Sequence, residues 1–273
     1  MDEIQRLYNE HPINEQEILN KLKEAGRDLD RLSPEDVSVF DQDHYGGIEA
    51  TDLLVQRLNI EEGSYVLDIC SGMGGTSRYL AYRHGCRVMG VDLHKPRSDS
   101  AIALTKRVGL DDKVSFVCGD AASLEFEDDT FDAALSQEAF LHIPDKKVLL
   151  DGCRRVIRPG GRLGFTDWII RGKLTKAVQA SLRDIIAAVG LVASDNYIAL
   201  LEASGFSQVQ FEDLSEWWQG ILRSRLEMFK SLKKETVRQF GRERHNQYIA
   251  AYTTFVEQIE KGNLGGGRFW GVA

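Results

Sequence analysis

Between Tyr65 and Ile170 the sequence alternates between short β-rich runs and helical patterns. The run YVLDIC is followed by RYLAYRHG, RVMGVDL, SAIALTKRVG and KVSFVCGD, and the alternation continues through FDAALSQ, a helical stretch over 146–157 and RLGFTDWI. Strands separated by helices pair in parallel, because the intervening helix carries the chain back across the sheet. We therefore predict a doubly wound α/β fold, in which ligands bind beyond the carboxyl ends of the strands.

The segments on either side of this alternation are mainly helical. Residues 1–60 carry two helix-start signatures, Asn14 with Glu17 and Ser33 before Pro34. We expect residues 61–273 to form the main domain, with helical lid parts at 171–201 and 215–261. The runs SQVQFEDL and GGGRFWGV predict two more strands, which brings the mostly parallel sheet to seven, and RPGG at 158–161 predicts a turn.

Charge and composition limit the partners of the chain. Its 273 residues carry a formal net charge of −8, whereas nucleic-acid binding depends on Lys and Arg that neutralise phosphates. No apolar run approaches the roughly 18 residues of a membrane span, and the start MDEIQRLYNE lacks the apolar centre of a secretory signal. We expect a cytoplasmic protein with a small-molecule partner, no nucleic acid and no membrane. The six histidines lack metal-ligand spacing. The four cysteines lie in or beside apolar segments and are expected to be core residues with reduced thiols: Cys70, Cys86, Cys118 and Cys153.

The run LDICSGMGG joins the first expected strand to the following helix through a loop of small residues. Such a loop places free backbone N–H groups and the positive end of a helix beside a ligand, so it favours a carboxylate or phosphate. Gly74 and Gly75 either adopt positive φ or let the ligand approach the backbone. The dinucleotide pattern GxGxxG competes with this interpretation, but counted from Gly72 its third glycine is replaced by Ser77. A nicotinamide-dependent oxidoreductase is disfavoured and stays open as an alternative.

Two acidic residues follow the next two expected strands. Asp92 ends RVMGVDL, where a carboxylate can accept hydrogen bonds from both hydroxyls of a ribose. Asp120, beside Ala121, follows KVSFVC, where it can accept from the exocyclic amine of a purine. Together they predict a nucleoside ligand, although Asp92 could instead cap the turn that follows it.

Roughly residues 40–170 resemble the class I S-adenosylmethionine-dependent methyltransferases. Five ordered motifs carry the resemblance: LDICSGMGG, GVDL, CGDA, FDAALSQEAFLHIPD and RPGGRLGFTD. The segment SQEAFLHIPDK and the ending EKGNLGGGRFWGV are similar to the sarcosine/dimethylglycine N-methyltransferases and related small-molecule methyltransferases, including the phosphoethanolamine enzymes. The resemblance implies a Rossmann-like methyltransferase fold and S-adenosyl-L-methionine as cofactor. It also implies that the N-terminal segment 1–60 closes over the site.

The family's cofactor contacts can be set on matching residues of this chain. The resemblance implies that the loop after the first strand holds the methionine part of the cofactor and that Asp92 binds the ribose. Leu93 would pack on the adenine, although HKPRSDS after Asp92 departs from the family and puts the stacking side chain in doubt. The full set of cofactor-binding residues implied is Asp68, Ser71, Gly72, Gly74, Asp92, Leu93, Asp120, Ala121 and Gln137.

Three residues are candidates for the acceptor side: His142, Gln137 and Tyr45. His142 would remove a proton from the acceptor if one must leave, or it merely positions its loop. Gln137 would border both cofactor and acceptor. Trp168 follows Asp167 at the end of the fifth expected strand, so we expect it at the mouth of the site, where it could hold a methylated ammonium through cation–π attraction. Glu138 could neutralise a cationic acceptor.

The leading interpretation is methyl transfer from S-adenosylmethionine to a small-molecule acceptor. The narrower resemblance favours the nitrogen of a small amine or amino acid, and a carbon, oxygen or sulfur acceptor of specialised metabolism remains an alternative. An inactive cofactor-binding subunit is a third hypothesis. The sequence leaves open whether the chain forms a homodimer.

Overall fold

The computed structural model describes residues 2–9, 11 and 13–273. Four helices precede the sheet, and the remaining elements follow in the order that the sequence predicts. The N-terminal helices are α1 (Asp2–Asn9), α2 (Glu15–Glu24), α3 (Pro34–Ser38) and α4 (Gly47–Leu58). The alternating part contains β1 (Tyr65–Ile69), α5 (Gly75–His84), β2 (Arg87–Asp92), α6 (Lys95–Arg107), β3 (Val114–Cys118), η1 (Ala121–Ser123), β4 (Phe131–Gln137), η2 (Phe140–His142), α7 (Lys146–Val156) and β5 (Ile157–Ile170). The C-terminal part contains α8 (Lys176–Ile186), β6 (Val192–Ala193), α9 (Ser194–Ala203), β7 (Ser207–Asp213), α10 (Ser215–Ser231), α11 (Lys233–Glu260) and β8 (Leu264–Val272).

The sheet has the strand order β3-β2-β1-β4-β5-β8-β7, and the short β6 pairs with β5 outside this path. Strands β1 to β5 run parallel, whereas β8 pairs antiparallel with both β5 and β7. This confirms the predicted doubly wound, mostly parallel sheet. The strand order reverses between β1 and β4, so the crevice for a ligand lies beyond their carboxyl ends.

The segment 158–161 lies within a strand, so the predicted turn is wrong. Strand β5 is continuous from Ile157 to Ile170. Its pairing with β4 shifts from Phe131 opposite Ile157 to Ala133 opposite Arg162, which makes the intervening residues a bulge. Bulges bend a strand and increase its twist, so the Pro and Gly residues act here without ending β5.

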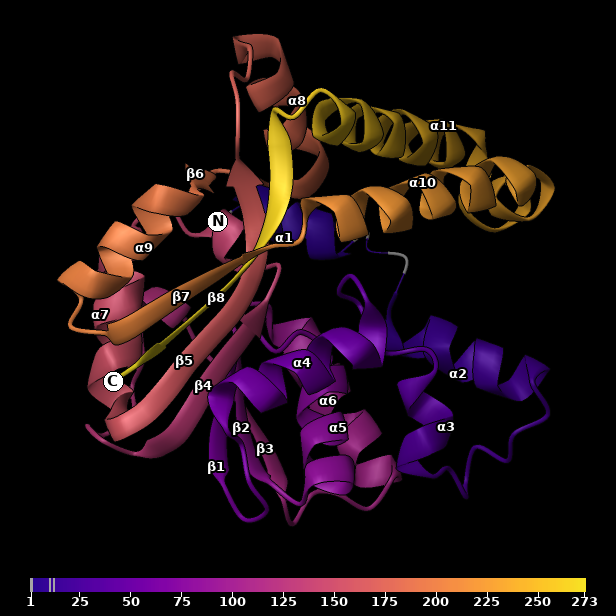
Figure 1. The fold of residues 1–273 in the computed structure, drawn as a ribbon. Coiled ribbons are helices and arrows are strands. Elements are labelled where there is room, and N and C mark those ends of the chain that lie inside the picture. The colour runs from indigo at the N-terminus through magenta and orange to yellow at the C-terminus, as the bar shows by residue number, and fades with distance from the viewer. Residues whose placement is uncertain (1, 10, 12) are drawn as a thin grey trace.

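The helices cover both faces of the sheet and extend past its end. One core cluster packs α7 and α9 on the sheet, and a second packs α2, α4, α5 and α6 against it. Helices α10 and α11 form a hairpin that projects beyond the sheet, above α2 and α3 (Figure 1). Within α11, Gly241 has non-helical φ and ψ of 84° and 161°, which kinks the helix. Helix α9 contacts α7 and β7, so residues 194–201 of the expected lid flank the sheet instead.

A third core cluster joins this hairpin to the sheet, and it corrects the expectation for Trp168. That side chain is 3% exposed and packs against the rings of Tyr45, Trp218 and Phe255 at 5.2–5.8 Å between centroids. Trp168 therefore supports the lid and does not face the mouth of a site. Among the described residues, no helix is long and apolar enough to cross a membrane.

Candidate functional site

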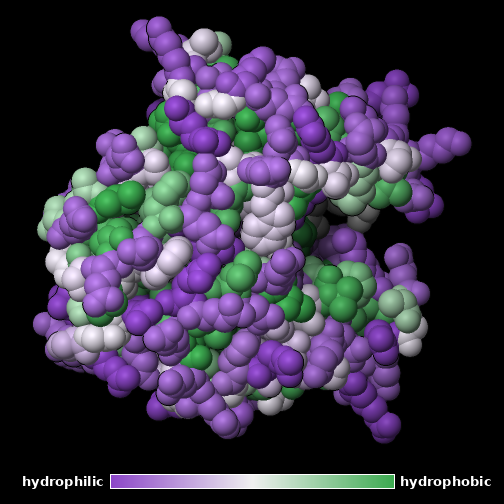
Figure 2. Space-filling model, in the orientation of Figure 1, coloured by the Kyte–Doolittle hydropathy of each residue, from purple (hydrophilic) through white to green (hydrophobic). Residues whose placement is uncertain are grey.

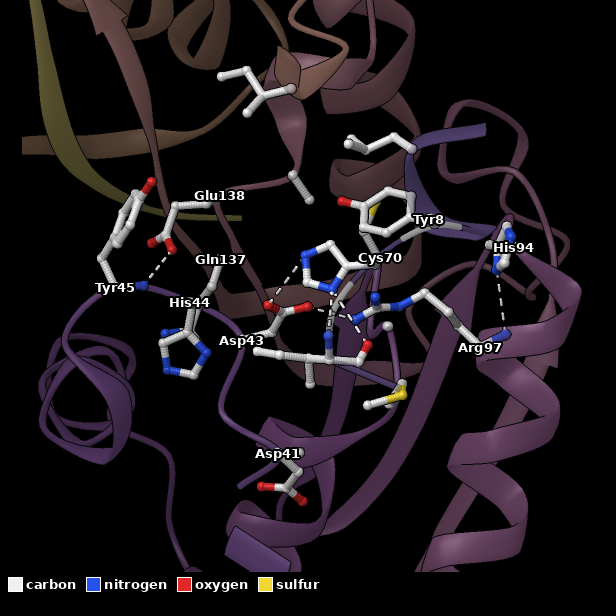
Figure 3. Close-up of a pocket in the computed structure, with 18 of the residues that line it drawn as sticks. Tyr8, Asp41, Asp43, His44, Tyr45, Cys70, His94, Arg97, Gln137 and Glu138 are labelled. Atoms are coloured by element: carbon white, nitrogen blue, oxygen red, sulfur yellow. Dashed lines mark hydrogen bonds and ion pairs between the residues drawn. The ribbon is translucent and has the colours of Figure 1, made fainter. Parts of the chain in front are cut away.

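A cavity of about 1520 Å³ lies at the carboxyl ends of β1 to β4. Its floor is made by the loops after these strands, and its walls come from α1, α2, the end of α8 and the α10–α11 hairpin. Figure 2 shows the molecule hollowed between the N-terminal helices and this hairpin. Figure 3 shows polar side chains from the strand ends and the N-terminal segment converging on the cavity.

The loop after β1 turns sharply at the cavity. Cys70, Gly72 and Gly74 all have positive φ, of 60°, 53° and 76°, and the N–H of Gly74 donates to the carbonyl of Ser71 at 2.8 Å. Ser71 and Gly72 line the cavity. A Cβ on Gly72 would lie 3.0 Å from Nη2 of Arg97, a side chain that also lines the cavity. Glycine at position 72 therefore keeps the space beside the loop open.

Gly74 needs to be small for a different reason from the one the sequence suggested. It does not line the cavity, and a Cβ there would lie 2.4 Å from Cζ of Phe116 on β3. Its positive φ adds a second requirement for glycine. Gly74 thus lets the loop pack closely against β3, and it shapes the loop without facing the cavity.

Asp68 is buried at the end of β1 with Ser77 as its partner. The Ser77 hydroxyl donates to Oδ2 of Asp68 at 2.5 Å. Burial raises the pKa of the Asp68 carboxyl from 3.8 to about 7, and this hydrogen bond opposes the rise. The serine that breaks the dinucleotide pattern therefore has a defined task, which is to hold the carboxylate at the cavity floor.

Asp92 organises the next loop through both of its oxygens. Oδ2 accepts from the N–H of Gly72 and Oδ1 accepts from the N–H of His94, each at 2.8 Å. Each carboxylate oxygen keeps a second lone pair for a ligand hydroxyl. Leu93, Asp120 and Ala121 line the same end of the cavity, so the structure brings together the residues that the sequence assigned to a nucleoside.

Gln137 ends β4 and lines the cavity, where its amide is bonded to two threonine hydroxyls. Its Oε1 accepts from the hydroxyls of Thr76 at 2.9 Å and Thr51 at 3.3 Å. Its Nε2 is buried and has no partner among the described residues. A buried amide donor without a partner is costly, so this N–H₂ group is suited to a ligand carboxylate or hydroxyl.

His142 is bonded through both ring nitrogens, and its second partner is Tyr8 on α1. Nδ1 lies 3.2 Å from the carbonyl of Ala187, and Nε2 lies 2.9 Å from the Tyr8 hydroxyl. A carbonyl only accepts, so Nδ1 carries the proton and Nε2 accepts from the phenol. Burial lowers the pKa of His142 from 6.5 to about 4, which keeps the ring neutral near pH 7.

Tyr8 on α1 contacts Arg97 on α6, which also pairs with Asp43, and sequence reasoning missed this group of residues. The Arg97 guanidinium lies 4.8 Å from the Tyr8 ring centroid and 2.6 Å from Oδ2 of Asp43. His11 lies 3.7 Å from Oδ1 of the same aspartate, and Nε2 of His94 contacts Asn9 at 3.0 Å. The sequence did hold one sign of this contact: the segment HKPRSDS, which departs from the family pattern, contains Arg97.

Tyr45 lies at the far side of the cavity, where it is fixed by Glu138. The Tyr45 N–H donates to Oε2 of Glu138 at 2.6 Å (Figure 3), and Thr166 donates to Oε1 at 2.7 Å. Burial raises the pKa of Glu138 from 4.5 to about 8. The Arg225 guanidinium stacks 4.6 Å from the Tyr45 ring centroid. His44 bonds Thr51 and the carbonyl of Gly47, so it positions this segment.

The described residues contain no group of three or more His, Cys, Asp or Glu side chains able to hold a metal ion. The four cysteines are all unpaired, and Cys118 is exposed, unlike the core thiol that the sequence predicted.

The comparisons with known proteins agree with this geometry. The methyltransferase domain family matches residues 67–165. Methyltransferase GfsG of Streptomyces halstedii is 34% identical over 184 residues, which are 66% of this chain and 66% of that protein. The sarcosine/dimethylglycine N-methyltransferase of Halorhodospira halochloris is 29% identical over 65% of each chain. The chain therefore spans less than two thirds of the length of these curated relatives.

Among solved structures, phosphoethanolamine N-methyltransferase 2 of Haemonchus contortus in complex with S-adenosyl-L-methionine has a TM-score of 0.79. It shares 21% sequence identity, and the match covers 98% of this chain and 59% of that one. This likeness shows a common fold. The matched domain and the methyltransferases among the sequence relatives show that the chain contains a methyltransferase domain over residues 67–165.

Proposed function

We propose that this protein transfers a methyl group from S-adenosylmethionine to a small-molecule acceptor. The observation that carries the proposal is the row of strand-end groups on one cavity floor: the Ser71–Gly72 loop, Asp92 and the unpartnered Nε2 of Gln137. A nucleoside with an amino-acid tail is complementary to this set, since ribose hydroxyls, a carboxylate and an ammonium all find partners there.

The residues fit the cofactor in separate parts. Ser71, Gly72 and Asp68 would hold the methionine part, with Arg97 adding a cation whose Nε and Nη1 have no partner among the described residues. Asp92 would accept from the ribose. The adenine would lie against Leu93, Ala121 and Asp120, all of which line the cavity. Gly74 is the one implied cofactor residue that we assign to loop shape alone.

When bound, the cofactor supplies a methyl group on a positively charged sulfur, an electrophile that needs alignment more than activation. The chain's own contribution is to exclude water and to manage the acceptor's proton. The Tyr8 oxygen can accept a hydrogen bond from an acceptor hydroxyl or ammonium. As that proton moves to Tyr8, the phenol proton moves to Nε2 of His142, which becomes an imidazolium. This pair places a proton acceptor within reach of an acceptor that must lose a proton, and the low pKa of His142 makes that group a weak base.

Two further parts of the proposal concern the compartment and the class of partner. The unpaired cysteines are consistent with a reducing compartment such as the cytoplasm. The net charge of −8 is consistent with a small-molecule partner instead of nucleic acid. The atom that is methylated, whether nitrogen, oxygen, carbon or sulfur, and the formation of a homodimer stay predictions without a test in these contacts.

Binding of S-adenosylhomocysteine by calorimetry, in competition with NADH, tests the cofactor assignment. We expect micromolar or tighter binding of S-adenosylhomocysteine that NADH does not displace. Release of S-adenosylhomocysteine with amines, phenols and thiols as acceptors then tests transfer. Displacement by NADH would favour the oxidoreductase alternative, and binding without turnover on any acceptor would favour the inactive subunit.

A further inference from the structure

The cavity is too large for its proposed cofactor and a small amine alone. Sites for one drug-sized ligand enclose about 300–1,000 Å³, whereas this cavity encloses about 1520 Å³. The groups assigned to the cofactor all lie at the strand ends on its floor. Beyond Tyr8 and His142, the cavity continues between the lid helices, and this outer chamber has no assigned occupant.

The wall of the outer chamber combines an apolar strip with polar side chains. The strip is built by side chains from α8, α10 and α11: Ile185, Ile186, Met228, Phe229, Tyr252 and Phe255. Asp184, Glu235, Arg244 and Gln247 line the cavity from the same helices. Met228 is 43% exposed and also lines a second hollow of about 410 Å³. A sarcosine-sized acceptor would leave the apolar strip facing water. An extended apolar ligand would bury it.

Charged side chains also line the cavity. Arg238 from α11 and Lys21 from α2 are exposed and belong to its lining. Figure 2 shows a hollow between the two helical parts. Deeper in, Arg225 is held against the Tyr45 ring and the carbonyl of His44. The chamber thus leads along the apolar strip to the Tyr8–His142 pair.

We propose that the acceptor is an amphipathic molecule with an extended apolar body, which lies along α8, α10 and α11 and presents a hydroxyl group to Tyr8. This inference rests on the proposed function, because it assumes that the cofactor fills the floor. It replaces the small amine or amino acid with a larger substrate. It also explains why the lid is a long helical hairpin with apolar side chains facing inward.

The test uses the full chain saturated with S-adenosylhomocysteine and three probes: phenol, 4-butylphenol and 4-octylphenol. Calorimetry should show affinity rising along the series, by up to about fourfold for each methylene that the wall buries. Met228→Ser and Ile186→Ser should weaken 4-octylphenol several-fold and leave phenol unchanged. Ile102→Ser is the matched control, because Ile102 is 49% exposed on α6 and does not line the cavity.

Three outcomes would overturn the inference: equal affinity for the three phenols, no binding of any phenol to the loaded protein, or an equal loss in Ile102→Ser. Absence of S-adenosylhomocysteine binding in the first step is a different failure, which refutes the proposed function and this inference with it. Since Met228 is exposed, its substitution leaves the fold intact and the comparison with Ile102→Ser remains interpretable.

Discussion

Tyr8 and His142 are 134 residues apart in the sequence and are joined by a hydrogen bond of 2.9 Å from the phenol to Nε2. The bond connects α1 to the loop after β4, so the N-terminal helix closes the cavity and completes its proton-accepting pair in one contact. A chain lacking α1 would keep the floor of the site and lose the acceptor chemistry.

Removing the Tyr8 hydroxyl tests this pair. Tyr8→Phe keeps the ring over Arg97 and deletes the proton path, so we expect kcat to fall about 10²-fold or more with S-adenosylhomocysteine affinity nearly unchanged. His142→Ala should lower kcat by a similar factor, and the double variant should be no worse than either, because the two act as one unit. Tyr82→Phe, away from the cavity, is the control. Additive losses would show that the two residues act separately.

Arg97 should fix α1 over the cofactor, because its guanidinium stacks on the Tyr8 ring of α1 and pairs with Asp43. Arg97→Met removes a bond of 2.6 Å and the cation at the Tyr8 ring, so we expect S-adenosylhomocysteine affinity to fall about tenfold or more. Deuterium exchange in α1 should rise. Lys95→Met is the matched control, since Lys95 pairs with Asp99 at 2.7 Å on the exposed face of the same helix. Equal effects in both variants would remove the special role of Arg97.

The floor of the site was predictable from sequence because it follows from strand topology. Carboxyl ends of parallel strands meet at one edge, so Asp68, Asp92, Asp120 and Gln137 were brought together by their order in the chain. Tyr8, Asp43 and Arg97 were not predictable in this way. Two of them come from segments before the sheet, whose placement depends on tertiary packing that no periodic pattern encodes.

The two errors near β5 have a common physical origin. Pro and Gly at 158–161 signal a turn locally, but pairing on both sides of the bulge keeps the strand continuous. Trp168 was placed at the mouth because it follows a strand-end aspartate. Strand β5 runs on to Ile170, and antiparallel pairing with β8 buries Trp168 under the lid, a long-range event that the local run does not reveal.

Gly74 offers a test of loop shape against ligand contact. Gly74→Ala should lower the free energy of unfolding by about 2 kcal/mol or more, through positive φ and overlap with Phe116. Gly109 has a φ of 68°, and a Cβ added there would meet nothing within 4 Å. Gly109→Ala therefore introduces the φ strain alone and should lower the free energy of unfolding by less. Phe116→Ala should be partly additive with Gly74→Ala, with a favourable coupling in the double variant. Urea denaturation measures all four; equal losses at both glycines would contradict the overlap.

Glu138 should make the stability of the ligand-free protein fall as pH rises. Its pKa is raised from 4.5 to about 8, chiefly by burial, so between these values the folded protein holds a proton that the unfolded chain has released. The stability that protonated Glu138 contributes is therefore fully present below about pH 4.5 and is lost as the pH rises toward 8. Glu138→Gln keeps the shape of the side chain and cannot ionise, so the slope of unfolding free energy against pH should become more positive in this window. Chemical denaturation from pH 5 to 8, on both proteins, measures the difference. Parallel curves would mean that Glu138 is ionised in the folded state, and Tyr45 would then be held by a carboxylate throughout the neutral range.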